Sequence, residues 1–462
     1  METIEKGSTQ KVAMTVHELL DQIGGLRDPY TCGIVISMGM LWLLSAISIM
    51  APAFISPFEK NLNDTPFVTV QDEFKLENSW INPAEWTGSM IFVGNLIAGQ
   101  FLALITDYYG RRHVVAISAL FSGFTGIASA LSPSFNLLLF TRFLTGVFFT
   151  AAFVTNYVLA AECLPLSSHS ICSLIFGLMW VTGYCLVSPV ALLFAHWRHF
   201  LAAASAPLAI FGFFLILALP ESLLYSVSKQ DADAIRAYLK NVERFSKKKL
   251  KYNLKAILQN DGDTSAGKNL KAIIGDLFQK DVLTNVLLSS YLWTAVYFVY
   301  NGMSFASTVL NVGNNHVQYI LSGLIEVPSY FLSPLLFDRL GRRFTVIILS
   351  LSGSVLHFVM GIMTIFSLET STIFMCVWLL AKLSASGVFL CLFIYGAEIF
   401  PVSCRSAALG LCSTLSNFGA IAAPHAPALG TLFSGATSFA FGLLFFIGSI
   451  TTKFLPETSH LH

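Results

Sequence analysis

Three polar signatures occur twice in this 462-residue chain, in the same order and separated each time by about half of its length. The three pairs are 107–112 with 338–343, 161–165 with 397–401, and 220–222 with 456–458. The first pair carries an Asp, a Gly and two Arg residues at one spacing, and each of the others centres on a Glu. Arginine bonds helix-end carbonyls and carboxylates, and an acid stabilises a helix N-terminus. The signatures therefore predict two equivalent sets of ion pairs in a duplicated unit.

Three further ionisable residues, Glu326, Lys382 and Arg142, lie inside long apolar segments. Each costs about 2.5–3.5 kcal/mol to insert into a bilayer, so each needs a partner or a polar cavity. Glu326 and Lys382 lie near the middle of their segments, whereas Arg142 lies nearer the outer end of its own. Two interpretations stay open for Glu326 and Lys382: they face a cavity, or they form a structural ion pair with each other.

The segments that must position these residues are apolar throughout. The chain is 55% hydrophobic and 11% charged, with a mean hydropathy of +0.69. A soluble chain carries about 25% charged residues, which excludes a large soluble protein. Runs of about 20 apolar residues are long enough to cross a bilayer as helices. The predicted spans are 33–55, 86–105, 114–131, 137–160, 171–194 and 200–219, then 282–306, 317–337, 345–366, 373–400, 406–423 and 431–455.

These spans predict an all-α membrane protein with twelve transmembrane helices in two pseudo-symmetric six-helix bundles, a pattern typical of transporters built from membrane repeats. Most of the 27 Lys and Arg residues fall on one side, so both termini are expected to be cytoplasmic. The expected divisions are a cytoplasmic N-terminal segment, two bundles joined by a cytoplasmic linker, and a short tail: 1–30, 31–220, 221–281, 282–458 and 459–462.

The doubled Asp-Gly-Arg-Arg signature resembles the major facilitator superfamily. The Pro-Glu-Ser and Pro-Glu-Thr runs resemble its sugar-porter and organic-ion branches. Within the latter, the organic cation/anion/zwitterion (carnitine) transporter family is similar at 142–146, 197–198, 300–302, 325–330 and 395–401. The resemblance implies the major facilitator fold and transport by alternating access.

In such a carrier, the repeated ion pairs are expected to hold the inner ends of the bundles together when it faces outward. We expect Glu162 with His169, and Glu398 with Arg405, to be companion pairs. The alternative is that these charges only set topology. The predicted gating set is Asp107, Gly110, Arg111, Arg112 and Glu162, then Asp338, Gly341, Arg342, Arg343, Glu398 and Arg405, with Arg142.

A substrate site is expected at mid-membrane. The resemblance implies that the position of Asn417 is acidic in cation carriers and basic in anion carriers, so this neutral residue, with Glu326 and Lys382, favours a zwitterion or a weakly polar organic ion. The alternative for Asn417 is a hydrogen bond between helices. Aromatic side chains, Tyr184 among them, can hold an ammonium group or simply pack. The predicted set is Glu326, Asn417, Lys382, Tyr300, Asn301, Tyr297, Tyr157, Phe153, Trp180 and Thr150.

The predicted function is secondary-active or facilitative transport of small organic ions, cation or zwitterion, across a plasma membrane. A carrier of sugars or other polar solutes, and a transport-inactive receptor or scaffold, are the alternatives. No catalytic, metal-ligand or phosphate-loop pattern stands out, so no enzyme, metal or cofactor is expected. The expected partners are a small organic ion, the lipid bilayer and either Na⁺ or H⁺ as coupling ion. A net charge of +1 argues against nucleic acid, and Asn63 begins a glycosylation sequon weakened by Pro66.

Overall fold

The computed structural model describes most of the chain. The described residues are 15–56, 67–76, 82–99, 101–102, 105–247, 249–250, 252–254, 257–258, 275–308, 314–401 and 404–458. Asn63 lies outside them, and so does the side chain of Asp107, so the glycosylation prediction and one predicted gating partner stay predictions.

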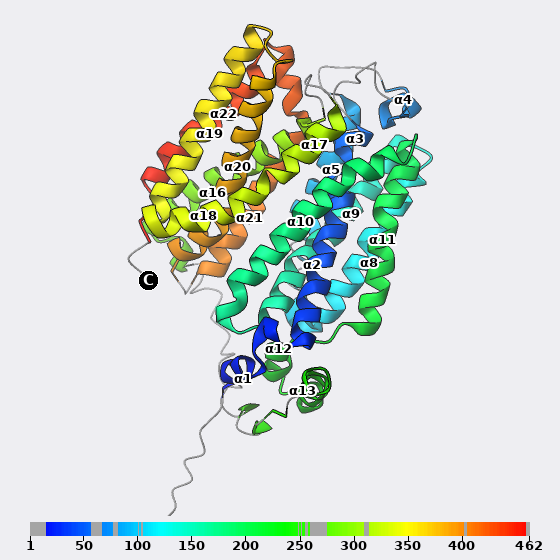
Figure 1. Cartoon of the computed structure of the whole chain (residues 1–462), viewed down its shortest axis with the longest axis vertical. Helices are drawn as coiled ribbons and strands as arrows, with labels where there is room; N and C mark the ends of the chain where they lie inside the picture. The colour runs from blue at the N-terminus through cyan, green and yellow to red at the C-terminus, as the bar shows by residue number, and fades with distance from the viewer. Residues whose placement is uncertain are drawn as a thin grey trace, which may run out of the picture.

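Two helical bundles stand side by side, one from each half of the chain (Figure 1). The N-terminal bundle contains α2 (Pro29–Met50), α5 (Trp86–Gly94), α8 (Arg111–Ala130), α9 (Phe135–Glu162), α10 (His169–Leu192) and α11 (Trp197–Ala218). The C-terminal bundle contains α16 (Lys280–Ala306), α17 (Asn315–Leu324), α18 (Glu326–Leu340), α19 (Arg342–Ile365), α20 (Thr372–Ile399), α21 (Arg405–Ala422) and α22 (Ala436–Lys453).

Eleven helical segments in the described part of the chain are long and apolar enough to cross a membrane. The remaining predicted span, 86–105, is divided: α5 is followed by the π-helical turn η3 (Asn95–Gly99), and α7 (Thr106–Tyr109) comes after residue 105. The composition of the spans thus predicted their positions, while the division depends on local packing.

The predicted span 317–337 is also divided, between α17 and α18. Pro328 lies in the first turn of α18 and has no N–H to donate to the carbonyl of Leu324, which weakens the helix at that point. Glu326 becomes the first residue of α18 at about mid-height of the bundle. The break places a carboxylate beside a helix N-terminus, where negative charge is favoured.

A small helical layer lies beneath the N-terminal bundle, at what we call the linker end (Figure 1). It contains α1 (Val16–Ile23), α12 (Leu223–Ser228) and α13 (Ala232–Ser246). The apolar face of α1 is buried in one hydrophobic cluster with Tyr238 and Leu239 of α13. The segments before the first span and after the sixth therefore pack together.

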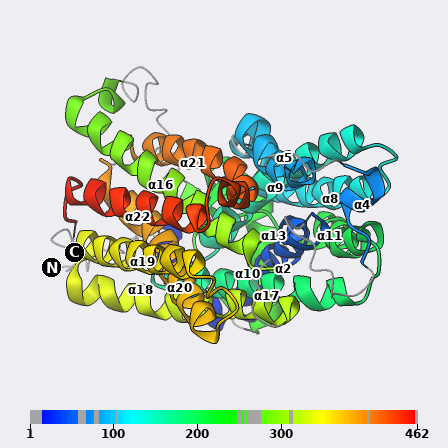
Figure 2. The same cartoon turned by 90° about the horizontal axis from the view of Figure 1, so that it is seen from above.

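The opposite end of the molecule, which we call the far end, carries α3 (Pro52–Ile55), α4 (Val70–Phe74), η2 (Pro83–Glu85) and η6 (Ala423–Thr431). One hydrophobic cluster there takes residues from both bundles, including Tyr184, Tyr319 and Phe305. The view from above shows α17 reaching across to α10 (Figure 2). The two bundles are thus joined mainly at the far end.

Candidate functional site

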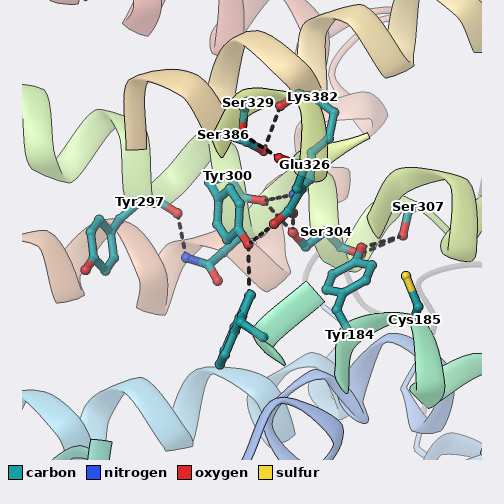
Figure 3. A network of polar contacts seen from close by, with 12 residues as sticks. Tyr184, Cys185, Tyr297, Tyr300, Ser304, Ser307, Glu326, Ser329, Lys382 and Ser386 are labelled. Atoms are coloured by element: carbon teal, nitrogen blue, oxygen red, sulfur yellow. Dashed lines mark hydrogen bonds and ion pairs between the residues drawn. The ribbon is translucent and has the colours of Figure 1, made fainter. Parts of the chain in front are cut away.

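A buried ion pair between α18 and α20 belongs to a network of polar contacts (Figure 3). The Nζ of Lys382, on α20, is 3.1 Å from Oε1 of Glu326, and the two side chains are 0% and 2% exposed. Lys382 also donates to Ser304 Oγ at 2.5 Å and to the Tyr300 carbonyl at 3.3 Å. The ammonium therefore has one carboxylate and two hydrogen-bond acceptors around it, so this charge is stabilised where it is buried.

Tyr300 and Trp180 extend this network toward the N-terminal bundle. The Tyr300 hydroxyl donates to Oε2 of Glu326 at 3.0 Å and accepts from Trp180 Nε1 at 3.3 Å. Lys382 Nζ also lies 3.8 Å from the centre of the Tyr300 ring, within cation–π range. Trp180 comes from α10 and the other three residues from α16, α18 and α20, so the network joins the two halves.

Aromatic side chains continue from both ends of this network. On the N-terminal side, Phe153 stacks on Trp42 with ring centres 4.0 Å apart and meets Trp180 edge-on at 5.8 Å. On the other side, Phe389 contacts both Tyr297 and Tyr300, at 5.0 and 4.8 Å. The structure thus brings together Glu326, Lys382, Tyr300, Trp180, Phe153 and Tyr297 of the predicted substrate set.

The other members of that set have local partners. Asn417 donates to the Ser413 and Thr414 carbonyls of its own helix, at 3.0 and 3.2 Å, and not across a helix interface. Asn301 likewise donates to the Tyr297 carbonyl at 2.8 Å.

The two remaining members bond side chains within the N-terminal bundle. The Tyr157 hydroxyl pairs with Ser173 Oγ at 2.8 Å, and Thr150 bonds Asn95 in the π-helical turn. None of these four shares a described hydrogen bond with Glu326 or Lys382.

The first copy of the repeated signatures forms one cluster at the linker end. The Glu221 carboxylate accepts from the backbone N–H groups of Arg111 and Arg112, at 3.0 and 3.1 Å, at the N-terminus of α8. Arg111 Nη2 lies 3.3 Å from Glu162 Oε1, and the Ser222 hydroxyl donates to Glu162. The three signatures thus meet through an anion at a helix N-terminus.

The second copy repeats this arrangement. Glu457 accepts from the backbone N–H of Arg342 at 3.0 Å, Arg342 Nε lies 3.2 Å from Glu398 Oε2, and the Thr458 hydroxyl donates to Glu398 at 2.5 Å. Gly341 precedes α19 with φ +84°, as Gly110 precedes α8 with φ +93°. A side chain at Gly110 would also meet the Glu221 carboxylate, so both turns favour glycine.

The expected companion pairs were wrong in their partners. His169 Nε2 lies 3.1 Å from the Ala161 carbonyl, and Arg405 Nε donates to the Phe400 carbonyl at 3.3 Å. The carboxylates of Glu162 and Glu398 pair instead with Arg111 and Arg342. Proximity along the chain suggested the first pairing, but the helix turns bring the arginines of the preceding loop closer.

The other predicted gating residues have different surroundings. Asp338 is exposed and makes no described ion pair. Arg112 donates to the Ile216 carbonyl at 2.9 Å, and Arg343 to the Leu455 carbonyl at 3.4 Å, both within their own bundles. Arg142 is fully buried inside the N-terminal bundle, where it bonds the Thr87 and Ser48 carbonyls.

Direct hydrogen bonds between the bundles, within the described residues, lie at mid-height or at the far end. Ser188 Oγ on α10 meets His316 Nδ1 on α17 at 3.0 Å, and Thr308 donates to the Ala53 carbonyl at 2.9 Å. The hydroxyl of Tyr184 reaches the Ser304 carbonyl at 3.4 Å. Sequence reasoning missed these contacts, because single polar residues in apolar spans do not reveal their partners.

The chain is similar to known membrane transporters. The family described as "Sugar (and other) transporter" matches residues 61–462. A Caenorhabditis elegans protein named only as a transporter, B0252.3, is 30% identical over 436 residues, covering 94% of this chain and 86% of the relative. Organic anion transporter 3 of Sus scrofa is 27% identical, and the match covers 81% of this chain and 69% of the relative. Solute carrier family 22 member 3 of Mus musculus is 26% identical, and the match covers 84% of this chain and 69% of the relative.

The fold also has solved neighbours. The inward-open xylose transporter XylE from E. coli matches with a TM-score of 0.68 at 17% identity, covering 93% of this chain and 97% of its own. At this identity the match speaks for the fold alone, and it confirms the predicted all-α membrane architecture.

Proposed function

The chain belongs to the sugar (and other) transporter family of the major facilitator superfamily, and from that premise we propose that it carries a small organic ion by alternating access, with a zwitterion as the favoured substrate. It is a multi-pass membrane transporter, and its relatives are named as transporters and not as enzymes. The substrate class is the proposed part.

The ion pair of Glu326 and Lys382 carries this proposal. The pair is neutral as a unit, so removing one charge leaves the other buried and unpaired. A zwitterion offers both signs: its ammonium group can lie beside Glu326 and its carboxylate beside Lys382. A simple cation or anion satisfies only one of the two, and a sugar needs neither.

The position of the Lys382 ammonium supports the same choice. It lies over the Tyr300 ring at 3.8 Å, which is where a substrate ammonium would gain cation–π attraction. Trp180, Phe153 and Tyr297 extend the aromatic surroundings from both bundles. These contacts suit a compact quaternary or primary ammonium group.

An organic anion is the second candidate. It is favoured by the names of several relatives and by Lys382, which can bind a carboxylate once Glu326 is protonated. Net charge of the transported species therefore separates the two candidates.

The arrangement of the bundles supports alternating access. The described hydrogen bonds between them lie at mid-height and at the far end, while the repeated signatures tie the linker ends within each bundle. We propose that this state is open toward the linker end. The Lys and Arg distribution supports a cytoplasmic linker end with both termini on that side.

The testing experiment is flux into proteoliposomes containing the purified chain. Labelled probes of similar size would be a betaine zwitterion, a tetraalkylammonium cation, a carboxylate and a hexose, each under no gradient, a pH gradient or a Na⁺ gradient. We expect saturable flux of the zwitterion, accumulated only under an ion gradient, because a neutral species gains nothing from the potential.

A preference for the carboxylate would replace the zwitterion by the second candidate. Saturable hexose flux alone would overturn the organic-ion proposal, and absence of flux for every probe would favour a transport-inactive receptor.

A further inference from the structure

A second acid–base pair joins the bundles at the far end. Glu85 ends η2 in the N-terminal half, and His425 lies in η6 of the C-terminal half. Glu85 Oε2 is 2.8 Å from His425 Nδ1, and the other ring nitrogen, Nε2, is 3.0 Å from Ser89 Oγ. Both nitrogens of one imidazole are therefore held by the opposite bundle. This pair is separate from the Glu326 network.

The hydrogen bonds around the ring fix where its protons are. Ser89 Oγ donates its single proton to the Ile421 carbonyl at 2.7 Å, so it can only accept from the ring. His425 Nε2 must then carry a proton. The lone pair of Nδ1 would then face the Glu85 carboxylate oxygen Oε2 at 2.8 Å, which is repulsive. One further proton, on either atom, turns this contact into a hydrogen bond. The closed contact thus holds one proton more than a neutral His425 beside a free Glu85 carboxylate.

No other group around Glu85 in the described part of the chain can neutralise its carboxylate in place of this proton. Glu85 is 2% exposed, its second oxygen is buried without a hydrogen-bond partner in the described part, and the adjoining recess is lined by Pro52, Ala53, Ser56, Phe305, Pro424 and Pro427. Burial raises the pKa of the Glu85 carboxyl, and the hydrogen bond from His425 lowers it less. Trp86 covers the imidazole, with ring centres 4.8 Å apart.

Charged groups on the neighbouring elements have partners elsewhere. On α9, Arg142 bonds backbone carbonyls; on α4, Asp72 caps its own helix and Glu73 pairs with Arg198 at 2.7 Å. Among the described residues of α3, α5, η6 and the adjoining end of α16, His425 is the one titratable group that meets Glu85. The pair must therefore take its proton from solvent.

We propose that Glu85 and His425 form a proton-binding site that holds the far end of the transporter closed. When the far end opens, the two residues separate, and the proton returns to solvent from a solvated imidazole and carboxylate. Proton binding is then tighter in the far-closed state, so acid favours closure by linkage. The inference rests on the proposed alternation of two states but not on the identity of the substrate.

The test measures the far-end distance without substrate, by spin labels at Leu193→Cys and Leu432→Cys in a Cys376→Ser background. As the pH falls from alkaline toward mildly acidic values, we expect the far-closed to far-open ratio to rise and then level off, by up to about tenfold per pH unit for one linked proton. Glu85→Gln can donate an amide N–H to Nδ1 without an added proton, so acid should no longer favour closure. His425→Gln should abolish the pH response.

His316→Gln is the matched control, because the described hydrogen bonds of His316 across the interface are with the Ser188 hydroxyl. It should retain the response. A wild-type ratio that does not change with pH, or a response that survives in Glu85→Gln and His425→Gln, would overturn the site. Because no substrate is present, the two proposals can fail independently. Absence of flux in the transport assay would not contradict the proton site, and a ratio that does not change with pH would not contradict transport.

Discussion

At the scale of single residues, Glu326 and Lys382 form a buried ion pair for which we also propose a role in substrate binding. Sequence reasoning left open whether these residues face a cavity or pair with each other, and the structure shows the pair. Pairing does not exclude a role in binding, because a substrate of mixed charge can exchange with each half. The two roles predict different behaviour when both charges are removed.

Glu326→Gln and Lys382→Met should each destabilise the protein by about 3–5 kcal/mol, because each leaves a buried charge unpaired. The double variant should recover most of this stability, since no charge remains. Thermal unfolding in detergent measures it. If the pair also binds substrate, the stable double variant should still fail to transport the zwitterion. Wild-type flux in the double variant would reduce the pair to a structural role.

Asn417 gives a contrasting prediction, because its amide donates to the carbonyls of its own helix. Asn417→Asp removes these donors and buries a charge beside carbonyl oxygens, so uptake of every substrate should fall alike. Asn417→Ser retains a donor for the carbonyl four residues earlier and should be mild. Uptake of a cation, an anion and a zwitterion, normalised to membrane protein, measures this. A stable Asn417→Asp protein with a shifted preference for cations would instead make Asn417 a selectivity residue.

At the scale of elements, the repeated signatures act as helix-end clusters. In each half, a Glu at the end of the last span accepts from the first N–H groups of the third span's helix, and a neighbouring hydroxyl reaches the Glu at the end of the fourth. The clusters therefore brace three spans within one bundle. The two clusters have matching contacts because the same signatures are repeated in both halves of the sequence.

Glu221→Gln and Glu457→Gln should each lower the free energy of unfolding by about 0.3–2 kcal/mol, the range for a charge at a helix N-terminus. The two losses should be similar because the clusters are equivalent. Asp233→Asn removes an exposed acid in the first turn of α13 that pairs with Arg236. It is the control for a solvated helix-terminal charge and should have a smaller effect. Thermal unfolding compares the three. If neither Glu variant differs from the control, the carboxylates do not stabilise these helix ends.

Hydropathy predicted the spans well where a single helix fills them, as in 345–366 against α19 (Arg342–Ile365). It could not predict the π-helical turn, where Asn95 meets Thr150 from another helix. Pro328 was a visible signal for the break between α17 and α18, but membrane helices often tolerate proline. The same holds for the candidate site. The types of residue in it could be predicted from the sequence, but which residues contact each other, such as Trp180 and Tyr300, could be seen only in the structure.

At the scale of the whole molecule, the contacts that stabilise each bundle differ from those that join the two bundles. Helix-end clusters stabilise each bundle by itself, whereas the far end and the Glu326 network join them. Alternation between two states requires that the far-end contacts break while each bundle stays intact. We therefore infer that a substrate crosses only when the far end opens.

A disulfide across the far end tests this claim most directly. Ser188 Oγ lies 3.0 Å from the His316 side chain and 3.1 Å from its carbonyl, so Ser188→Cys with His316→Cys should oxidise readily. The measurement is zwitterion flux in proteoliposomes before and after reduction, with each single cysteine variant as control. We predict that the oxidised protein binds the zwitterion but does not transport it, and that a reductant restores flux. Undiminished flux through the fully oxidised protein would contradict alternating access through the far end.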